Sequence, residues 1–370
     1  MKRYKVIGAI LLGVSAWSYG QPTVITKLFH HKVPNIDVSL EMGSVVLYFT
    51  QKPTVTVTSK IEGDKKRSIY FLPNVRIKSD LKGVVDRIQQ DADPPYRITI
   101  QEVTNPQQGL QVTLTYNPHN VGISYELFDS ITLQKGVAFR LFNKKVLSRL
   151  QASGKQIIKT AANSPRVVID CGHGGIDTGA VGCNHIQEKE VNLQVGLQVA
   201  QLLIDKKIAV DLVRRSDQTC LLDERTTFAN QKDARLFVSL HSNAAPDASM
   251  SGIETYCLSP ALFSLGDTTL APEEHSFVST QLQGKYAQSN ALAHAVHSSL
   301  LKSVRKYQIA DRRVKQSVAQ VLLGITIPAV LVELGFLTHH KESSLLIQKQ
   351  YQSRLARGIV SGILSYLHRA

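Results

Sequence analysis

The hydrophobic pattern of the chain changes once, near residue 165. Before that point, residues 44–50, 54–58, 96–100 and 110–116 alternate apolar with polar side chains. A period of two predicts strands with one buried face, in an antiparallel sheet or a small sandwich. Beyond residue 165, short apolar runs alternate with segments whose apolar residues recur at helical spacing. This alternation predicts an α/β domain with a mixed, mostly parallel sheet flanked by helices, preceded by a smaller all-β domain.

The predicted boundaries follow from this change of pattern. Residues 151–165 are polar, rich in small side chains and end at Pro165, which is typical of a linker. The β-rich part therefore covers 21–150 and the α/β part 166–370. The β-rich part contains no cluster of metal ligands or nucleophiles. We interpret it as a binding or targeting module, with a structural spacer as the alternative.

The first twenty residues have the features of a signal peptide. Lys2, Arg3 and Lys5 precede a short apolar core at 6–14. Small residues at 18 and 20 then predict cleavage before Gln21. We expect an exported protein, located in the periplasm or cell envelope, without a transmembrane anchor once the leader is removed. A retained N-terminal anchor is the alternative, although the apolar run is short for a membrane span.

The chain is basic, and its cysteines lie in the second half. Its 43 Lys and Arg against 29 Asp and Glu give a formal charge of +14, spread along the chain. This excess favours anionic polymers or surfaces as partners. Nucleic acid is not expected, because basic and aromatic residues are not interleaved as in stacking platforms. Cys171, Cys183, Cys220 and Cys257 allow up to two disulfides in three pairings in an oxidising compartment, and buried free thiols are the alternative.

Four residues of the α/β part form a candidate metal site. His173, His241 and Glu333 each follow a short apolar run, and Glu188 opens a segment of helical spacing. Sites in α/β sheets gather beyond the carboxyl ends of the strands. Two imidazoles and one carboxylate are a set that zinc uses in hydrolases, with the fourth position left for water. Glu333 is the candidate general base for that water.

The same region allows a second metal set. His185 and Glu188 form an H-x-x-E pattern, which together with His241 and Glu333 imitates the ligands and base of zinc carboxypeptidases. The two sets differ in which histidine completes the ligand shell.

Four motifs in this order carry a resemblance to a known family. Residues 167–182 (VVIDCGHGGIDTGAVG) resemble the opening motif of the zinc-dependent N-acetylmuramoyl-L-alanine amidases, the amidase 3 family. The segments EKEVNL at 188–193, LFVSLHSNA at 236–244 and PAVLVELGFL at 328–337 are similar to its second, third and fourth motifs. The resemblance covers about 166–367.

The resemblance implies an activity and a role for each motif residue. Zinc would be held by His173, Glu188 and His241, and Glu333 would activate water to cut the amide between N-acetylmuramic acid and L-alanine. Arg312 would hold a substrate carboxylate or orient the site, and Asn243, two residues after His241, would hydrogen-bond the substrate or support a ligand. By the same resemblance the β-rich part is a cell-wall-targeting domain, peptidoglycan is the partner, and a regulatory protein of the cell-division machinery is a second partner. A non-catalytic wall-binding protein is the alternative, but all four chemical positions are filled.

Three departures from the family pattern bear on these expectations. Cys171 replaces the proline that usually precedes Gly-His-Gly, where packing or a thiol–zinc contact would explain it. Arg313 replaces the glycine after Arg312, in a turn that favours positive φ. Residues 256–286, where some relatives carry a long helical plug, contain Pro260, Gly266 and Pro272, so we do not expect one long helix there.

Overall fold

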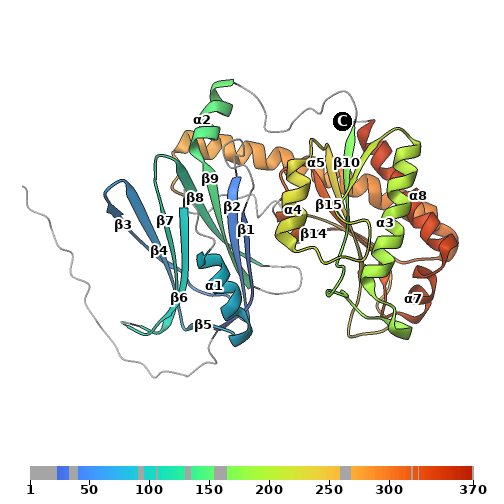
Figure 1. The fold of residues 1–370 in the computed structure, drawn as a ribbon, viewed down its shortest axis with the longest axis horizontal. Coiled ribbons are helices and arrows are strands. Elements are labelled where there is room, and N and C mark those ends of the chain that lie inside the picture. The colour runs from blue at the N-terminus through green and yellow to red at the C-terminus, as the bar shows by residue number, and fades with distance from the viewer. Residues whose placement is uncertain are drawn as a thin grey trace, which may run out of the picture.

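The computed structural model describes residues 23–32, 41–90, 96–105, 107–129, 135–153, 165–258, 268–317, 320–323 and 325–368 (Figure 1). The predicted signal peptide at 1–20 lies outside these residues, as does most of the predicted linker, and both stay predictions. None of the helices within the described ranges is long and apolar enough to cross a membrane.

The N-terminal part contains two sheets that pack around one core. One has the strand order β5-β1-β2-β9-β8 and the other β3-β4-β7-β6, and every pairing is antiparallel except β1 with β5. The strands are β1 (Thr23–Lys32), β2 (Glu41–Phe49), β3 (Thr56–Glu62), β4 (Lys65–Pro73), β5 (Val75–Ile77), β6 (Tyr96–Val103), β7 (Gly109–Tyr116), β8 (Val121–Asp129) and β9 (Lys135–Asn143).

Alternation in β7 explains this sandwich. Leu110, Val112 and Leu114 point into the shared core, whereas Gln111 and Thr115 lie on the other face. The part is not purely β. Helix α1 (Lys82–Gln90) packs against β6, and α2 (Lys144–Ser153) follows β9. Because α2 continues to Ser153, the first three residues of the predicted linker are helical.

The C-terminal part is the expected mixed, mostly parallel sheet, in the order β11-β10-β12-β15-β13-β14. All its pairings are parallel except β13 with β15. The strands are β10 (Arg166–Cys171), β11 (Ala209–Leu212), β12 (Leu236–Asn243), β13 (Ile253–Leu258), β14 (Asp311–Ser317) and β15 (Ala329–Phe336). Strands β12 and β15 include His241 and Glu333, which the sequence placed just after the apolar runs. The two residues pair with one another, and this pairing extends both strands.

Helices cover both faces of this sheet. On one face lie α3 (Glu188–Asp205), α8 (Lys349–Leu367) and the C-terminal half of α5 (Pro272–Val304), with α7 (His340–Leu346) beside them. On the other face lie α4 (Leu222–Gln231) and α6 (Gln320–Leu323). In β15, Val330 and Val332 face the first group and Leu331 faces the second. By alternation Glu333 shares the face of Leu331.

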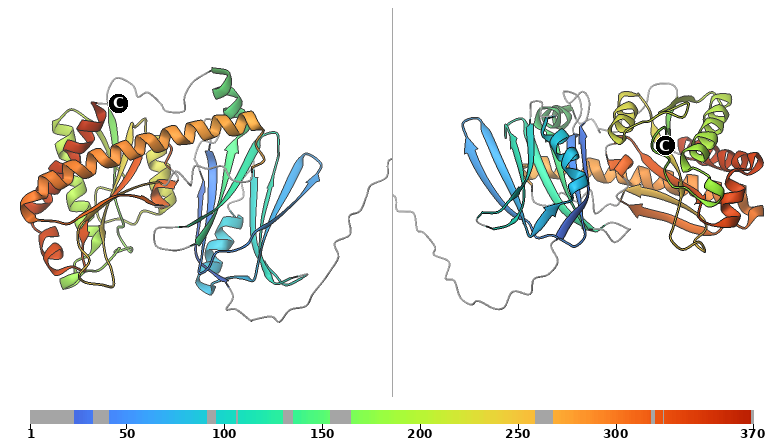
Figure 2. Two further views of the ribbon diagram at one scale, coloured as in Figure 1. Left: turned by 180° about the vertical axis from the view of Figure 1, so that it is seen from behind. Right: turned by 60° about the horizontal axis from the view of Figure 1, so that its bottom comes forward.

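Helix α5 is longer than the sequence suggested. Pro272 is its first residue, a position where a missing N–H costs nothing, so proline begins this helix instead of breaking it. The expectation of no long helix is therefore wrong for residues 272–286. The N-terminal half of α5 extends beyond the C-terminal sheet to the sandwich (Figures 1 and 2). There Val278 and Leu282 share one apolar cluster with Tyr48 and Phe142.

Candidate active site

His173 lies in the turn after β10 and is held from two sides. Its φ is 62°, in the left-handed region. Its carbonyl oxygen accepts a hydrogen bond from Arg225 at 2.7 Å, and its Nδ1 lies 2.8 Å from Oδ2 of Asp177. The Asp177 contact leaves Nε2 free to face Glu188 at 3.1 Å. A carboxylate on one ring nitrogen is a common way to orient a histidine ligand through the other.

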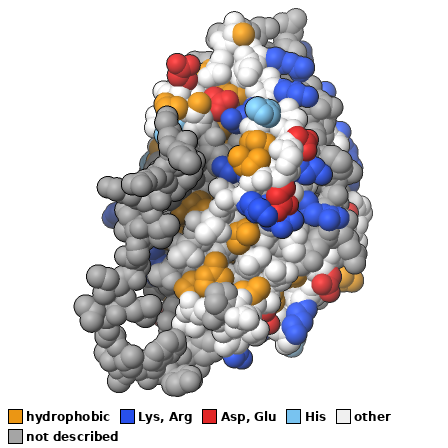
Figure 3. Space-filling model, turned by 90° about the vertical axis from the view of Figure 1, so that its left-hand side faces the viewer, with side chains coloured by type: hydrophobic (Ala, Val, Ile, Leu, Met, Phe, Trp, Pro, Cys, Tyr) orange, Lys and Arg blue, Asp and Glu red, His pale blue; other side chains and the backbone are white. Residues whose placement is uncertain are grey.

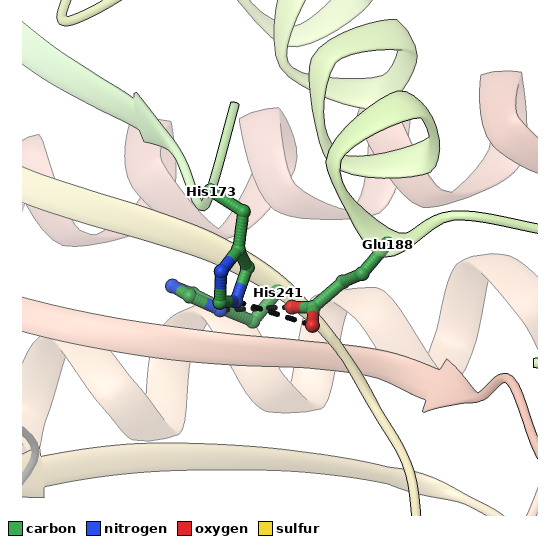
Figure 4. Close-up of side chains that lie close together, drawn as sticks. All are labelled: His173, Glu188 and His241. Carbon is green, nitrogen blue, oxygen red and sulfur yellow. Dashed lines mark hydrogen bonds and ion pairs between the residues drawn. The ribbon is translucent and has the colours of Figure 1, made fainter. Parts of the chain in front are cut away.

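Glu188 is the first residue of α3 and is buried. Its Oε1 lies 2.9 Å from Nδ1 of His241 and accepts hydrogen bonds from the Ser242 amide (3.1 Å) and Asn192 (3.2 Å). Figure 4 shows the carboxylate between the two imidazoles. One ligand atom from each of His173, Glu188 and His241 lies within 4.8 Å of the others. Nitrogen and oxygen donors this close could hold a metal ion.

The glycines of the first motif make room for this cluster. A Cβ on Gly172 would lie 2.3 Å from the His241 ring, and one on Gly179 would lie 2.5 Å from Oε2 of Glu188. Both distances are shorter than any real Cβ contact. The glycine-rich segment is therefore required by the close approach of the backbone to His241 and Glu188.

The electrostatics of the cluster favour a cation. Burial opposes ionisation of Glu188, but hydrogen bonds with His173 and His241 hold its pKa far below its usual range. Burial would likewise lower the pKa of His173, but hydrogen bonds to Glu188 and Asp177 raise it above its ordinary value. Both shifts show that positive charge is favoured beside the ionised carboxylate of Glu188, and a bound cation would supply such a charge.

Glu333 lies next to this cluster in a row that crosses the sheet. It pairs with His241 on β12 and with Glu254 on β13. Its Oε2 is shielded from solvent and has no hydrogen-bond partner in the described part of the chain. Burial raises the pKa of Glu333 well above its ordinary value, and the charges of Glu188 and Glu254 raise it further. An unpaired, shielded carboxyl beside a candidate metal site is suited to exchanging protons.

Glu254 is a site residue that the sequence reasoning missed. It is buried and lies 3.3 Å from Nε of Arg312, and it also forms an ion pair with Lys315. Asn243 donates a hydrogen bond to it at 2.8 Å. A single acidic residue within the apolar run of β13 was the available signal, because burying it requires partners.

The two predicted substrate contacts both lie against Glu254. Besides facing this carboxylate, Arg312 stacks over Phe336 at 5.1 Å from the ring centroid. Both ends of the Asn243 side-chain amide form hydrogen bonds. Its nitrogen donates to Glu254, and its Oδ1 accepts from the backbone N–H of Ala244 at 2.8 Å. These contacts favour a positioning role for Asn243. Direct substrate contact by either residue stays a prediction.

A second missed residue is Arg225 of α4. It is buried and donates to Oδ1 of Asp170 at 2.6 Å and to the carbonyl oxygens of Cys171 and His173. It therefore fixes the backbone that carries His173. Arginine is a common surface residue, and the sequence around 225 contains no signal that would have selected it.

The remaining predicted residues lie away from the cluster. His185 is exposed and is not among the three residues that could share a metal. All four cysteines are free thiols. Cys171 faces α3, on the opposite side of the sheet from Asp170, and burial raises its pKa to about 12. These observations fit packing of Cys171 and not a thiol–zinc contact.

A cleft with a volume of about 420 Å³ opens beside the two histidines. Its lining mixes polar groups with aliphatic side chains, namely Asp170, His173, Ile176, Asp177, Thr219, Cys220, Leu221, Leu222, Arg225, His241, Val321 and Leu331. The volume is within the range of small-molecule sites.

Comparison with known proteins gives the family. The amidase 3 family, described as N-acetylmuramoyl-L-alanine amidase, matches residues 167–365. The chain is 36% identical over 202 residues to the uncharacterized protein YqiI of Bacillus subtilis, covering 54% of this chain and 84% of that protein. It is 28% identical over 251 residues to the N-acetylmuramoyl-L-alanine amidase AmiA of Salmonella typhimurium, covering 63% and 86%.

A solved N-acetylmuramoyl-L-alanine amidase from Clostridium difficile is also similar. It is 33% identical, and the match covers 56% of this chain and 98% of that one with a TM-score of 0.47. The family match spans more than half of the chain and includes all four motifs. The chain therefore belongs to the amidase 3 family of N-acetylmuramoyl-L-alanine amidases.

Proposed function

We propose that this protein is a zinc-dependent peptidoglycan hydrolase that cuts the amide between N-acetylmuramic acid and L-alanine. The observation that carries the proposal is the His173, Glu188 and His241 cluster with the unpaired Glu333 beside it, in a chain of this family. The ligand set supports zinc, since two imidazoles and one carboxylate leave a position for water and substrate.

The site fits a divalent cation on its own geometry. Hydrogen bonds to the two imidazoles lower the pKa of Glu188, and Gly172 and Gly179 let the backbone approach the cluster closely. His173 would bind through Nε2, because Asp177 engages Nδ1. Bound zinc would polarise the scissile carbonyl and lower the pKa of a water molecule to about 7.

The residues of the chain then perform the proton transfers. Glu333 accepts a proton from the attacking water as the new C–O bond forms. It returns that proton to the amide nitrogen as the C–N bond breaks, which releases a free muramic acid carboxyl group and an L-alanine amine. Because its shielded Oε2 has no competing partner among the described residues, Glu333 is available for both steps. Arg225 and Asp177 keep His173 oriented throughout.

Mass spectrometry of purified peptidoglycan digested by the full chain tests this proposal. We expect glycan without stem peptides and peptides with a free N-terminal L-alanine, and we expect a zinc chelator to abolish both. Release of single amino acids from the peptide end would instead support the carboxypeptidase reading. Absence of any product with zinc-loaded protein would reject a hydrolase.

For the sandwich we propose a wall-targeting role, carried by a trough on the outer face of the four-stranded sheet. The trough has a volume of about 840 Å³. Rows of neighbours cross it, with Arg67, Thr115 and Arg97 in one row and Gln111 and Gln101 in another. Figure 3 views the molecule from the side of β3 and β4 and shows Lys and Arg interspersed with hydrophobic side chains. Hydroxyls, amides and cations suit a glycan that carries carboxylates.

Sacculus pull-down tests the trough. We expect Arg97→Ala combined with Gln111→Ala to weaken binding of the full chain to purified sacculi, while hydrolysis of soluble muropeptides is unchanged. Lys82→Ala, an exposed residue of α1 away from the trough, is the control. Unchanged sacculus binding by the double variant would leave the sandwich as a spacer.

Export and regulation extend the same proposal. The basic head and apolar core of residues 1–20 support secretion to the periplasm or cell envelope. A regulatory protein of the cell-division machinery stays a prediction. N-terminal sequencing of the exported protein would test the leader, with Gln21 as the expected first residue.

A further inference from the structure

Three exposed hydrophobic side chains gather at the metal cleft. The described residues include nine large hydrophobic side chains that are at least 40% exposed, and Ile176 (90%), Leu221 (53%) and Leu222 (40%) all line the cleft that contains His173 and His241. The nearly buried Leu331 also lines this cleft. Exposed aliphatic groups around a cleft commonly mark a binding surface.

Hydrogen bonds of the backbone around Ile176 fix the turn that exposes its side chain. Its amide donates to Oγ1 of Thr219 at 3.1 Å, and the amide of Gly175 donates to Oδ1 of Asp217 at 2.7 Å. Gly174 and Asp177 exchange two backbone hydrogen bonds around the turn. A Cβ on Gly175 would lie 2.2 Å from Thr219, so the two loops are in close contact. The turn therefore holds an isoleucine in solvent, beside the loop that carries Leu221.

We infer that Ile176, Leu221 and Leu222 form a subsite for the methyl group of the L-alanine residue on the leaving side of the scissile amide. This inference rests on the proposed function, since it assigns a substrate group to the cleft of that site. It makes these three residues determinants of specificity and not catalytic groups.

The position of Glu333 indicates that the aliphatic residues face the amine side of the scissile amide, which leaves as L-alanine. The proton returned to the amide nitrogen comes from Glu333, so that nitrogen lies beside it during bond cleavage. Leu331 is two residues earlier on β15 and shares its sheet face. The alanine Cα is bonded to that nitrogen, so under this inference its methyl group lies against the aliphatic residues of the same cleft, which are Leu331, Leu221, Leu222 and Ile176.

A comparison of soluble substrates that differ by this methyl group tests the subsite. The substrates are N-acetylmuramoyl dipeptides with L-alanine, glycine or D-alanine at the first position, hydrolysed by the full zinc-loaded chain. One methyl group in an apolar pocket discriminates by roughly 10-fold or more, so we expect kcat/KM to favour L-alanine over glycine by about that factor. D-alanine directs its methyl elsewhere and is expected to resemble glycine or to react more slowly.

The variants Ile176→Ser and Leu222→Ser are expected to reduce the preference for L-alanine to about twofold, mainly by slowing the L-alanine substrate. Ile347→Ser, 51% exposed and outside the cleft lining, is the matched control and is expected to keep the full preference. Thermal melting of each variant checks that the fold is intact.

The outcomes separate the inference from the function. An unchanged preference in both variants would overturn the subsite, and so would an equal loss on all substrates in a variant that melts normally. Another outcome is a variant that stops distinguishing substrates with and without the N-acetyl methyl group while it keeps its preference for L-alanine. That result would place the glycan at these residues and would also overturn the subsite. Failure of the unmodified protein on every substrate would instead reject the proposed function.

Discussion

His173 shows how the chain fixes a single side chain. A φ of 62° is costly for a residue with a Cβ, and such strain persists only where the surroundings impose it. Here the Arg225 hydrogen bond to its carbonyl oxygen and the Asp177 contact to its ring supply that constraint. The orientation of Nε2 is therefore set before any metal binds, which reduces the conformational entropy lost on binding.

Metal content of three variants tests the residue roles. We expect His173→Ala to lose zinc and activity, because a three-ligand shell that loses one member holds the metal poorly. Glu333→Gln should keep zinc while turnover falls by roughly 10²–10⁴-fold, the usual contribution of a general base. His185→Ala, an exposed position, should keep both.

Elemental analysis beside amidase rates distinguishes the two metal sets. A zinc-depleted His185→Ala protein with a zinc-loaded His173→Ala protein would reverse the assignment. Loss of zinc from Glu333→Gln would make Glu333 a ligand and not a base.

Arg313 gives a prediction about stability. It occupies φ of 70° where the family pattern has glycine, and Oδ1 of Asp311 accepts its N–H at 2.7 Å. Relief of left-handed strain is worth about 1–2 kcal/mol, and the greater freedom of glycine in the unfolded chain offsets about half of it. We therefore expect Arg313→Gly to raise Tm by about 1–2 °C.

Arg305→Gly is the control for that measurement. Arg305 has a helical φ of −49° at the end of α5, so glycine there brings only its entropic cost and should lower Tm. A drop in Tm for Arg313→Gly of similar size would mean that position 313 is unstrained.

At the scale of elements, the site depends on how strands alternate and pair. Successive side chains of a strand point to opposite faces. Leu331 and Glu333 therefore share the face covered by α4 and α6, while Val330 and Val332 pack against α3, α5 and α8. Antiparallel β13 then places Glu254 beside Glu333. A shift of register by one residue would move this row to the wrong face of the sheet.

The N-terminal half of α5 is the element whose packing we expect to matter most for joining the two parts. Leu282 is buried in the cluster shared with the sandwich, whereas its neighbour Gln283 is exposed. Leu282→Ala should lower the free energy of unfolding by about 2–3 kcal/mol through lost burial and a cavity. Gln283→Ala should change it by less than about 0.5 kcal/mol in the same urea titration. Equal effects would show that this half of α5 does not pack as described.

At the scale of the whole molecule, the sandwich and the α/β part share an interface. Thr269 donates a backbone hydrogen bond to the carbonyl of Ile123 at 2.9 Å, and Lys144 lies 3.1 Å from Glu274 of α5. The apolar cluster continues across both parts, from Tyr48 to Phe237. The two parts therefore contribute to one another's stability.

Truncation at residue 166 tests that dependence. Every residue proposed for catalysis lies in 166–370, so the truncated protein should hydrolyse soluble muropeptides when folded. It should also melt at a lower temperature and aggregate more readily, because removing the sandwich exposes the shared apolar cluster. An unchanged Tm would show that the α/β part is stable by itself and that the interface contributes little.

Much of the fold and the clustering of His173, Glu188 and His241 could be anticipated because their signals are local. The period-two segments became β2, β3, β6 and β7, and the short apolar runs became β10, β11, β12 and β15. Strand ends place side chains at one edge of a parallel sheet, which is why His173 and His241 meet. Pro272 misled the prediction, because proline breaks a helix when it lies in the interior but is favoured at the first position of a helix.

The contacts that complete the site are not local. Glu254 joins Glu333 only because β13 runs antiparallel to β15, and Arg225 reaches the His173 carbonyl across 52 residues of chain. Periodicity reports which face of a strand is buried, but strand order, strand direction and the docking of α5 on the sandwich depend on packing between distant segments. The amidase family and the cluster of His173, Glu188 and His241 were therefore readable from motifs, whereas tertiary packing alone placed Glu254, Arg225 and the aliphatic rim of the cleft beside that cluster.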